Sequence, residues 1–269
     1  MFYHLAVSAL LCSTVAKSPT KPILFLHLHK GAGTFLCDLA KANNMRTSHN
    51  NCLVQKNQRC CGGDSVKKQI QYAQKTPYNF VANENYLYEA MVPGMFTYVT
   101  ILRDSWSRYI SHFRHVCRLY NMPLRKKTFF AWLKGQPDNW NLRHICGTRC
   151  MFRDKFSLTE SDYNYALNRL QKFDHVVHFD SNTTRFAKET LALCDGLKWN
   201  ECPLDKKNNA PPQKTFDFYV PFSNFNSMTT MDDCLFKNLS FSQCLGASVY
   251  FNSRSKEYNS PCGKKCTKY

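Results

Sequence analysis

The chain has 269 residues, of which 43% are hydrophobic and 14% aromatic, so it can bury the core of one large domain or two small ones. This composition excludes a disordered or collagen-like chain. Lys and Arg number 36 against 19 Asp and Glu, and the net charge of +17 points to an anionic partner such as a nucleic acid, a membrane surface, a nucleotide or an acidic polysaccharide.

Residues 1–16 predict a secretory signal peptide. An apolar run from Leu5 to Cys12 is followed by small residues up to Ala16, and it is shorter than the ~20 apolar residues of a membrane span. The segment has no Lys or Arg, so an uncleaved anchor is the alternative, and membrane contact is expected only in that case. Sequons at Asn182 and Asn238 fit a secretory glycoprotein. We expect a protein of the Golgi lumen or membrane, or a secreted one, with no nucleic acid as partner.

The cysteine pattern favours disulfides over zinc. The chain contains 14 cysteines, a high number for a reducing compartment. Two pairs have C-x3-C spacing, Cys146/Cys150 and Cys262/Cys266. No C-x2-C pair, the usual zinc spacing, occurs in the sequence. Without Cys12 the number is odd, so one thiol stays free or pairs with another chain. We expect Cys37, on a predicted core helix, to be the free one.

The first half of the chain alternates strand and helix patterns. Apolar runs predict strands over Ile23–His29, Tyr78–Ala82 and Phe96–Leu102. Helices are predicted over Thr34–Asn43, Val66–Lys75 and Ser105–Tyr120.

The second half continues this alternation. The predicted elements are a helix over Asp162–Lys172, a strand over His175–Phe179, a helix over Thr184–Cys194 and a late helix from Met231 to Phe236. A basic loop, Lys206–Lys214, and a disulfide-clipped C-terminal tail, Ser253–Tyr269, lie between and after them. The order predicts an α/β fold over residues 22–269, a single domain with a parallel central sheet and helices on both faces.

The turn after the first predicted strand has the residues of a phosphate site. Its sequence is Lys30-Gly31-Ala32-Gly33-Thr34. Gly31 and Gly33 let the backbone approach a ligand, and the free N–H groups of the following helix favour an anion. Lys30 adds a positive charge and Thr34 a hydroxyl. The spacing differs from both G-x4-G-K-[ST] and G-x-G-x-x-G, and a plain tight turn is the alternative.

The turn after the third predicted strand carries a second set of candidate phosphate-binding residues. Arg103 ends this strand, and open α/β sheets bind ligands outside the carboxyl ends of their strands. Ser111 follows two turns along the next helix. An arginine with a hydroxyl suits a second phosphate. The alternative is a structural ion pair between Arg103 and Asp104.

Together the two sets resemble the sulfotransferases that use 3′-phosphoadenosine 5′-phosphosulfate (PAPS). In that superfamily a K-x-x-[GS]-T loop holds the 5′-phosphosulfate and a later R-D-x7-S element holds the 3′-phosphate. The segments FLHLHKGAGTF and YVTILRDSWSRYISHFRHV are most similar to the Golgi heparan sulfate 6-O-sulfotransferase branch. The resemblance implies a P-loop-like nucleotide-binding fold without a metal, PAPS as co-substrate, and Lys30, Gly31, Ala32, Gly33, Thr34, Arg103 and Ser111 as its binding residues.

The sequence departs from the family in two places. Ser105 stands where those enzymes usually have a proline, and FVANENYLYEA lacks the histidine that serves there as base in the glycan 6-O-enzymes. We therefore predict Glu84, which follows the second strand, as the base, because many carbohydrate sulfotransferases use a glutamate at this point of the fold. Glu89, His112 and His115 are the alternatives. Lys30 is also predicted to be catalytic, by stabilising charge on the leaving phosphate.

The expected activity is transfer of a sulfuryl group from PAPS to a hydroxyl of an anionic or neutral polysaccharide, in particular a glycosaminoglycan. A tyrosylprotein sulfotransferase is the alternative enzyme, since its motifs also include a lysine loop and a later Arg/Ser pair. A secreted heparin-binding protein without catalysis is the alternative of a different class. A phosphoryl kinase is disfavoured, because neither a Walker A motif nor magnesium-binding carboxylates accompany the loop.

Overall fold

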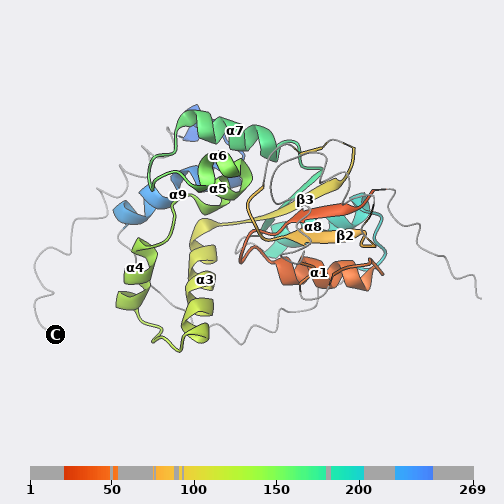
Figure 1. Cartoon of the computed structure of the whole chain (residues 1–269), viewed down its shortest axis with the longest axis horizontal. Helices are drawn as coiled ribbons and strands as arrows, with labels where there is room; N and C mark the ends of the chain where they lie inside the picture. The colour runs from red at the N-terminus through yellow and green to blue at the C-terminus, as the bar shows by residue number, and fades with distance from the viewer. Residues whose placement is uncertain are drawn as a thin grey trace, which may run out of the picture.

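A four-stranded parallel sheet forms the centre of the molecule (Figure 1). The computed structural model describes residues 21–48, 51–53, 75, 77–87, 91–92, 94–179, 183–202 and 222–244. The strands, in the spatial order β2-β1-β3-β4, are β1 (Ile23–Leu26), β2 (Phe80–Asn83), β3 (Thr97–Arg103) and β4 (His175–Phe179). All pairings are parallel, which confirms the predicted α/β class and parallel sheet.

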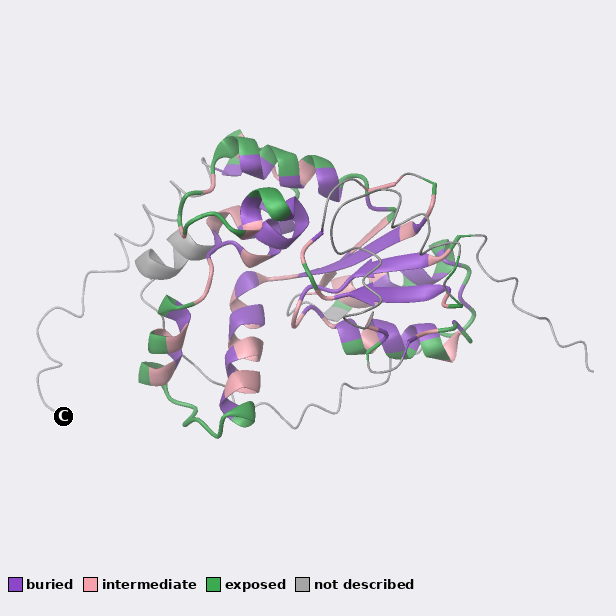
Figure 2. Ribbon diagram, viewed as in Figure 1, coloured by how far each residue is buried: buried purple, intermediate pink, exposed green. Residues whose placement is uncertain are grey.

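Helices cover both faces of the sheet, because the strands are apolar on both sides (Figure 2). In β1, Ile23 and Phe25 face one core and Leu24 and Leu26 face the other, as strand alternation requires. The first core includes α1 (Gly33–Ala42) and α8 (Thr183–Gly196). The second includes α5 (Trp140–Cys146), α7 (Glu160–Leu170) and α9 (Phe222–Phe236).

Two further helices project beyond the sheet as a hairpin (Figure 1). Helix α3 (Ser105–Leu119) leads away from β3, and α4 (Lys126–Lys134) returns beside it. They enclose a small core of their own, made of Tyr109, Phe113, Cys117, Phe129 and Leu133. The sequence predicted α3 but not α4, α5 or the short α6 (Thr148–Met151).

Helix α5 has a cap that is distant in the sequence. The buried Asp232 of α9 accepts hydrogen bonds from the backbone N–H groups of Asn141 and Leu142, at 2.9 and 2.7 Å. The side chain of Asn139, the N-cap residue of α5, in turn accepts from the N–H groups of Met231 and Asp232. Since Asp232 lies 90 residues after Leu142, no local pattern marks this helix start.

All but one of the cysteines in the described part of the chain form disulfides, as predicted. The pairs are Cys37–Cys52, Cys146–Cys150, Cys194–Cys202 and Cys234–Cys244. The prediction that Cys37 is free is wrong, because the short segment at residues 51–53 packs Cys52 against α1. Among the described cysteines the free one is Cys117, buried between α3 and α4.

Several predictions fall on residues outside the described part of the chain. They are the signal peptide, most of the predicted helix at 66–75, Glu89, the sequon asparagine Asn182, the basic loop at 206–214 and the C-terminal tail. Within the described part, no helix is both long and apolar enough to cross a bilayer.

Candidate functional site

Three chain segments meet at the carboxyl edge of the sheet. Strands β1, β2 and β3 are adjacent and parallel, so the residues that follow or end them share one edge. The Nη1 atom of Arg103 donates a hydrogen bond to the carbonyl oxygen of Lys30 at 3.0 Å. Glu84 Oε1 lies 2.7 Å from His29 Nδ1. The structure thus brings together Lys30, Glu84 and Arg103, which the sequence placed in one site.

The N-terminus of α1 is open. It has neither a side-chain cap nor an acidic residue in its first turn. The first N–H groups of an α-helix have no intrahelical acceptor, and with the helix dipole they attract an anion. The loop before α1 places Lys30 (φ 65°) and Ala32 (φ 59°) in the left-handed region. For non-glycine residues this conformation costs about 1–2 kcal/mol each. Strain is therefore concentrated where Lys30 meets the helix start.

The two glycines of this loop serve close packing within the protein. Neither is among the residues with positive φ. A Cβ on Gly31 would lie 2.8 Å from the Leu28 carbonyl oxygen, and one on Gly33 would lie 1.8 Å from Nε2 of the buried His27. From the sequence, Gly31 and Gly33 were predicted to let a ligand approach the backbone. In the structure the atoms that approach them belong to the chain itself.

The position of Arg103 is fixed by several contacts. Its Nε donates to Ser107 Oγ at 2.9 Å, and its guanidinium carbon lies 4.8 Å from the centre of the Phe179 ring. Asp104 does not pair with it but caps α3, accepting from the Ser107 N–H at 2.9 Å. The hydroxyl that Arg103 contacts is thus that of Ser107, at the i+4 spacing, whereas the role of Ser111 in holding a phosphate stays a prediction. Among the described residues Ser111 has no hydrogen bond to Arg103; it lies one turn further along the same face of α3.

Positive charges converge on this edge. Burial and the neighbouring charges of Arg108 and Arg114, opposed by Asp104, lower the pKa of Arg103 to about 10, so its guanidinium is charged at neutral pH. Burial, followed by the charges of Arg118 and Arg103, also lowers the pKa of Lys30. Burial is the largest cause of both shifts, and repulsion among the cations adds to it; an anionic ligand would relieve that repulsion.

His29 and Glu84 form a partly exposed pair. Burial raises the pKa of Glu84, but the hydrogen bond from His29 and the charges of His27, His29 and Lys30 outweigh it and hold the pKa below its ordinary value. The carboxylate is therefore ionised at neutral pH and accepts a hydrogen bond from His29 Nδ1. In the neutral tautomer that makes this hydrogen bond, the proton of the His29 ring is on Nδ1, and Nε2 is the hydrogen-bond acceptor. Sequence reasoning missed His29, although its place at the end of the predicted strand Ile23–His29 was a usable signal.

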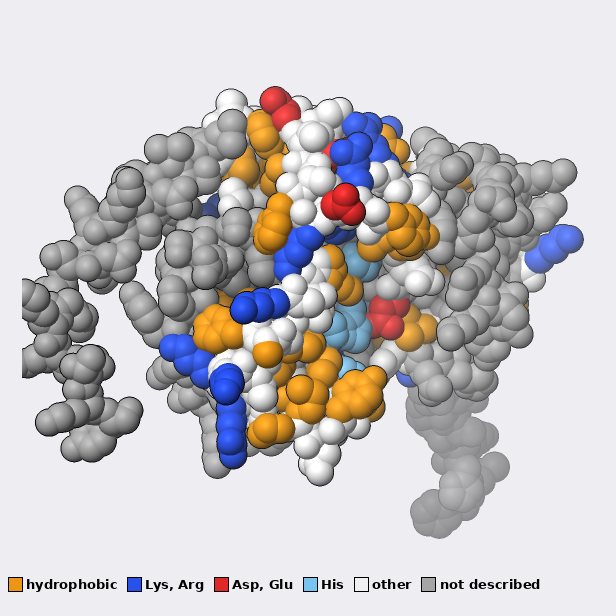
Figure 3. Space-filling model, turned by 60° about the vertical axis from the view of Figure 1, so that its left-hand side comes forward, with side chains coloured by type: hydrophobic (Ala, Val, Ile, Leu, Met, Phe, Trp, Pro, Cys, Tyr) orange, Lys and Arg blue, Asp and Glu red, His pale blue; other side chains and the backbone are white. Residues whose placement is uncertain are grey.

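Two further histidines stand beside this pair on α3. The ring centres of His112 and His115 lie 4.7 and 5.9 Å from that of His29. Burial, then the charges of His29 and Arg108, lowers the pKa of His112 to about 3, and burial and Lys30 lower the pKa of His115. His112 is thus neutral and a weak base. Figure 3 shows histidine side chains gathered next to an acidic one at the centre of this face.

Three phenylalanines lie beside the open helix end. The ring centres of Phe35 and Phe186 are 5.3 Å apart, and those of Phe179 and Phe186 are 4.7 Å apart. All three are partly buried, and Phe179 also carries the Arg103 guanidinium. Their rings lie at 56° and 90° to one another and form an apolar patch beside Arg103, which no local sequence pattern indicated.

No family model, curated protein or solved structure matches this chain. The chemistry of the site is therefore argued from its own contacts.

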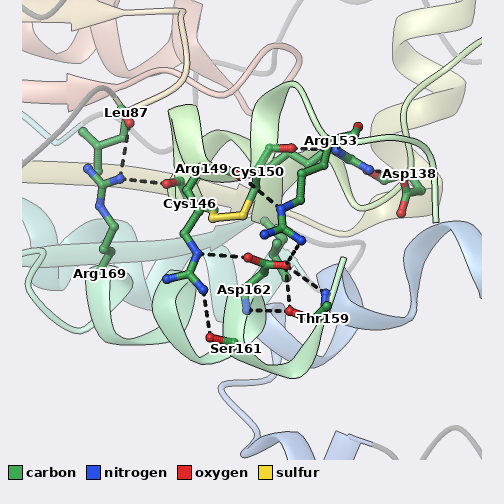
Figure 4. Close-up of a disulfide and its surroundings, with 12 residues drawn as sticks. Leu87, Asp138, Cys146, Arg149, Cys150, Arg153, Thr159, Ser161, Asp162 and Arg169 are labelled. Carbon is green, nitrogen blue, oxygen red and sulfur yellow. Dashed lines mark hydrogen bonds and ion pairs between the residues drawn. A yellow bond between two sulfur atoms is a disulfide. The ribbon is translucent and has the colours of Figure 1, made fainter. Parts of the chain in front are cut away.

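A second polar cluster, between α5, α6 and α7, contains Cys146 and Cys150, one of the two C-x3-C pairs for which zinc was the alternative to a disulfide. Cys146, Cys150 and Asp162 offer ligand atoms within 4.8 Å of one another. However, the two sulfur atoms form a disulfide, and the Asp162 carboxylate accepts from Arg149 and Thr159 and pairs with Arg153 (Figure 4). In this form the cluster has no thiolate to offer a metal, and its contacts join the three helices.

Proposed function

We propose that this protein is a PAPS-dependent sulfotransferase that transfers a sulfuryl group to a hydroxyl of a carbohydrate. One observation carries the proposal: the uncapped start of α1 adjoins Lys30 and Arg103, which are joined through the Lys30 carbonyl, at the sheet edge that also holds His29 and Glu84. A nucleotide with several phosphates needs converging positive groups, and a hydroxyl acceptor needs a nearby base.

The described residues fit such a nucleotide. The N–H groups at the start of α1 and the ammonium of Lys30 would hold the 5′-phosphosulfate, with the Thr34 hydroxyl exposed beside them. Arg103, fixed by Ser107, would hold the 3′-phosphate. The aromatic surface of Phe35 and Phe186 is suited to stack on adenine. PAPS supplies the activated sulfuryl group.

Proton removal is best assigned to His29, with Glu84 as its partner. An ionised carboxylate with a lowered pKa is a weak base, whereas its hydrogen bond holds the His29 ring with Nε2 free to accept the proton of the acceptor hydroxyl. Glu84 then stabilises the imidazolium that forms. This assignment differs from the sequence prediction, in which Glu84 itself takes the proton.

Turnover of two variants separates the two assignments. Both assignments predict that Glu84→Gln binds nucleotide normally and turns over slowly. If His29 is the base, His29→Gln also loses turnover, by about 10²–10⁴-fold, with nucleotide affinity retained. Full turnover of His29→Gln together with loss in Glu84→Gln would return the role of base to Glu84.

The first experiment is thermal unfolding of the secreted protein with and without 3′,5′-adenosine bisphosphate, the product nucleotide. Ligand at ~100 times its Kd should stabilise the protein by ~2.7 kcal/mol. Lys30→Ala and Arg103→Ala should each reduce the shift, whereas Lys172→Ala, at an exposed position after α7, should not. An unchanged shift in both site variants would refute the site. The absence of any shift in the wild type would favour the heparin-binding alternative.

The acceptor is tested separately, by sulfuryl transfer to heparan sulfate, to a neutral polysaccharide and to a tyrosine peptide. Transfer to a polysaccharide is the expected result. Transfer to the peptide alone would replace the carbohydrate assignment with that of a tyrosylprotein sulfotransferase and leave the nucleotide site in place.

A further inference from the structure

The loop that joins α3 to α4 exposes a cluster of large hydrophobic side chains. The exposed fractions are 63% for Leu119, 68% for Tyr120, 36% for Met122 and 37% for Leu124. The other large hydrophobic residues that are exposed in the described part of the chain are Phe152, Phe156, Tyr165 and Leu191, which lie on other segments. We call residues 118–127 the hairpin tip.

The hairpin tip is an ordered turn. The Met122 N–H donates to the Cys117 carbonyl at 2.9 Å, and the Tyr120 N–H donates to the Val116 carbonyl at 3.0 Å. On the α4 side, Thr128 Oγ1 donates to the Pro123 carbonyl at 2.8 Å. Behind the tip, the small core of the hairpin is closed by its own aromatic residues. The exposed side chains are therefore presented outward by a fixed backbone and are surplus to the packing of the hairpin.

The charge around these side chains has one sign. The sequence has no Asp or Glu between Asp104 and Asp138. In the same stretch it has the cations Arg108, Arg114, Arg118, Arg125, Lys126, Lys127 and Lys134. Four of these cations lie at the hairpin tip and are exposed, namely Arg118, Arg125, Lys126 and Lys127. Figure 3 shows hydrophobic and basic side chains side by side over the lower part of this face.

We infer that the hairpin tip docks onto an anionic phospholipid surface. Leu119, Tyr120, Met122 and Leu124 would enter the boundary between headgroups and acyl chains, while the flanking Lys and Arg contact lipid phosphates. A soluble polyanion such as a sulfated polysaccharide could pair with the cations. It would leave the leucines and the methionine against water or sugar hydroxyls. An anionic lipid surface satisfies both halves of the tip. The inference does not depend on the proposed sulfotransferase activity or on an N-terminal anchor.

The test is co-sedimentation of the full secreted protein with vesicles of phosphatidylcholine alone and of an equal mixture with phosphatidylserine. We expect firm binding to the mixed vesicles only. Neutralising three cations in Arg125→Gln/Lys126→Gln/Lys127→Gln should weaken it about a hundredfold, at about fivefold for each charge. Leu119→Asn/Leu124→Asn should weaken it at least about tenfold. Lys172→Gln and Leu191→Asn, exposed positions on other segments, are the matched controls.

Insertion is tested with Tyr120→Trp and vesicles whose acyl chains carry bromine. The bromine should quench the tryptophan fluorescence that this variant adds to that of the wild type. Such quenching would support entry of the tip into the bilayer. Three results would overturn the inference: vesicle binding unaffected by the leucine variant, binding to heparin with no binding to vesicles, or self-association lost in the leucine variant while vesicles are ignored. Thermal unfolding at the wild-type temperature confirms that each variant is folded.

Discussion

Helices α1 and α7 begin in opposite ways. At α7, the side chain of Thr159 accepts from the Asp162 N–H, and the Asp162 carboxylate accepts from the Thr159 N–H at 2.9 Å. Its first turn also holds two acidic residues, Glu160 and Asp162. Helix α1 has no cap and no acid, and a lysine precedes it. One helix start is thus satisfied within the protein, whereas the other has no side-chain cap and would be satisfied by the anion of the proposed function.

The difference is also one of energy. A capping side chain contributes about 1 kcal/mol to helix stability, and α1 forgoes it. The left-handed Lys30 and Ala32 each add a further cost of about 1–2 kcal/mol. A bound anion would offset part of this deficit, because it would satisfy the free N–H groups. Under the proposed function, the uncapped and strained helix start beside a cation is the binding position, and the capped one is a structural joint.

The largest effect is expected from adding a side chain at Gly33, the first residue of α1. Gly33→Ala places a Cβ 1.8 Å from His27 Nε2, so the buried ring must move, and we expect a loss of about 3 kcal/mol in the free energy of unfolding together with loss of nucleotide binding. Urea unfolding measures the first. Gly135→Ala is the control, because its Cβ would lie 3.5 Å from the Trp132 carbonyl, an ordinary contact. Equal stability of the two variants would show that the His27 packing does not constrain the loop.

The next effect concerns the capped helix. Asp162 is fully buried, caps α7 and pairs with Arg149 and Arg153, so Asp162→Asn should lower the free energy of unfolding by about 2 kcal/mol. Nucleotide affinity should not change, because the cluster is structural. If Asp162→Asn binds nucleotide more weakly under conditions in which it is fully folded, the cluster would be linked to the site. Asp195→Asn, at an exposed position of α8, is the control.

The same residue predicts a pH dependence. Burial raises the pKa of Asp162, but hydrogen bonds from Thr159 and Arg149 and the charge of Arg153 outweigh it and hold the pKa below its ordinary value of 3.8. As pH falls, the unfolded chain takes up the proton first. The stabilisation is therefore complete above pH 3.8 and is lost as pH falls from there through the pKa of the folded state. In urea unfolding, the gap between wild type and Asp162→Asn should be constant near neutral pH and shrink below 3.8. A gap that persists unchanged in acid would contradict this.

The smallest expected effect on stability comes from making α1 resemble α7. Thr34→Asp puts an acidic residue in the first turn of α1, at an exposed position, and should stabilise the ligand-free protein by about 0.3–1 kcal/mol. It should also weaken binding of 3′,5′-adenosine bisphosphate, since two negative charges would then compete for the helix start. Thr34→Asn separates charge from the loss of the hydroxyl. Tighter nucleotide binding by Thr34→Asp would show that the anion does not sit at α1.

The sheet could be predicted from sequence because its signals are local. Apolar runs mark β1, β3 and β4, and the rule that parallel strands end at one edge brought Lys30, Glu84 and Arg103 together before any coordinates. Helix α5 could not be predicted in this way, because its N–H groups are satisfied by Asp232 from a distant helix.

Within the site, the sequence could not show which of two similar residues makes a given contact. His27 and His29 lie two residues apart, yet His27 is buried against Gly33 and His29 meets Glu84. Ser107 and Ser111 lie one helical turn apart on α3, and Ser107 is the one that Arg103 reaches. Each choice depends on side-chain packing from other segments, which a single sequence does not display.

Helix α3 connects the two proposed sites as a spacer of fixed length. Its first residue follows Arg103 and Asp104, and its residues 105–117 extend about 20 Å before the hairpin tip begins. If the tip rests on a bilayer with α3 upright, the sheet edge is held at about that height. Acceptor groups close to the lipid headgroups would then lie below the reach of the site, and those on chains that extend from the membrane would lie level with it. The length of one helix would thus select acceptors by their distance from the membrane, independently of their chemical identity.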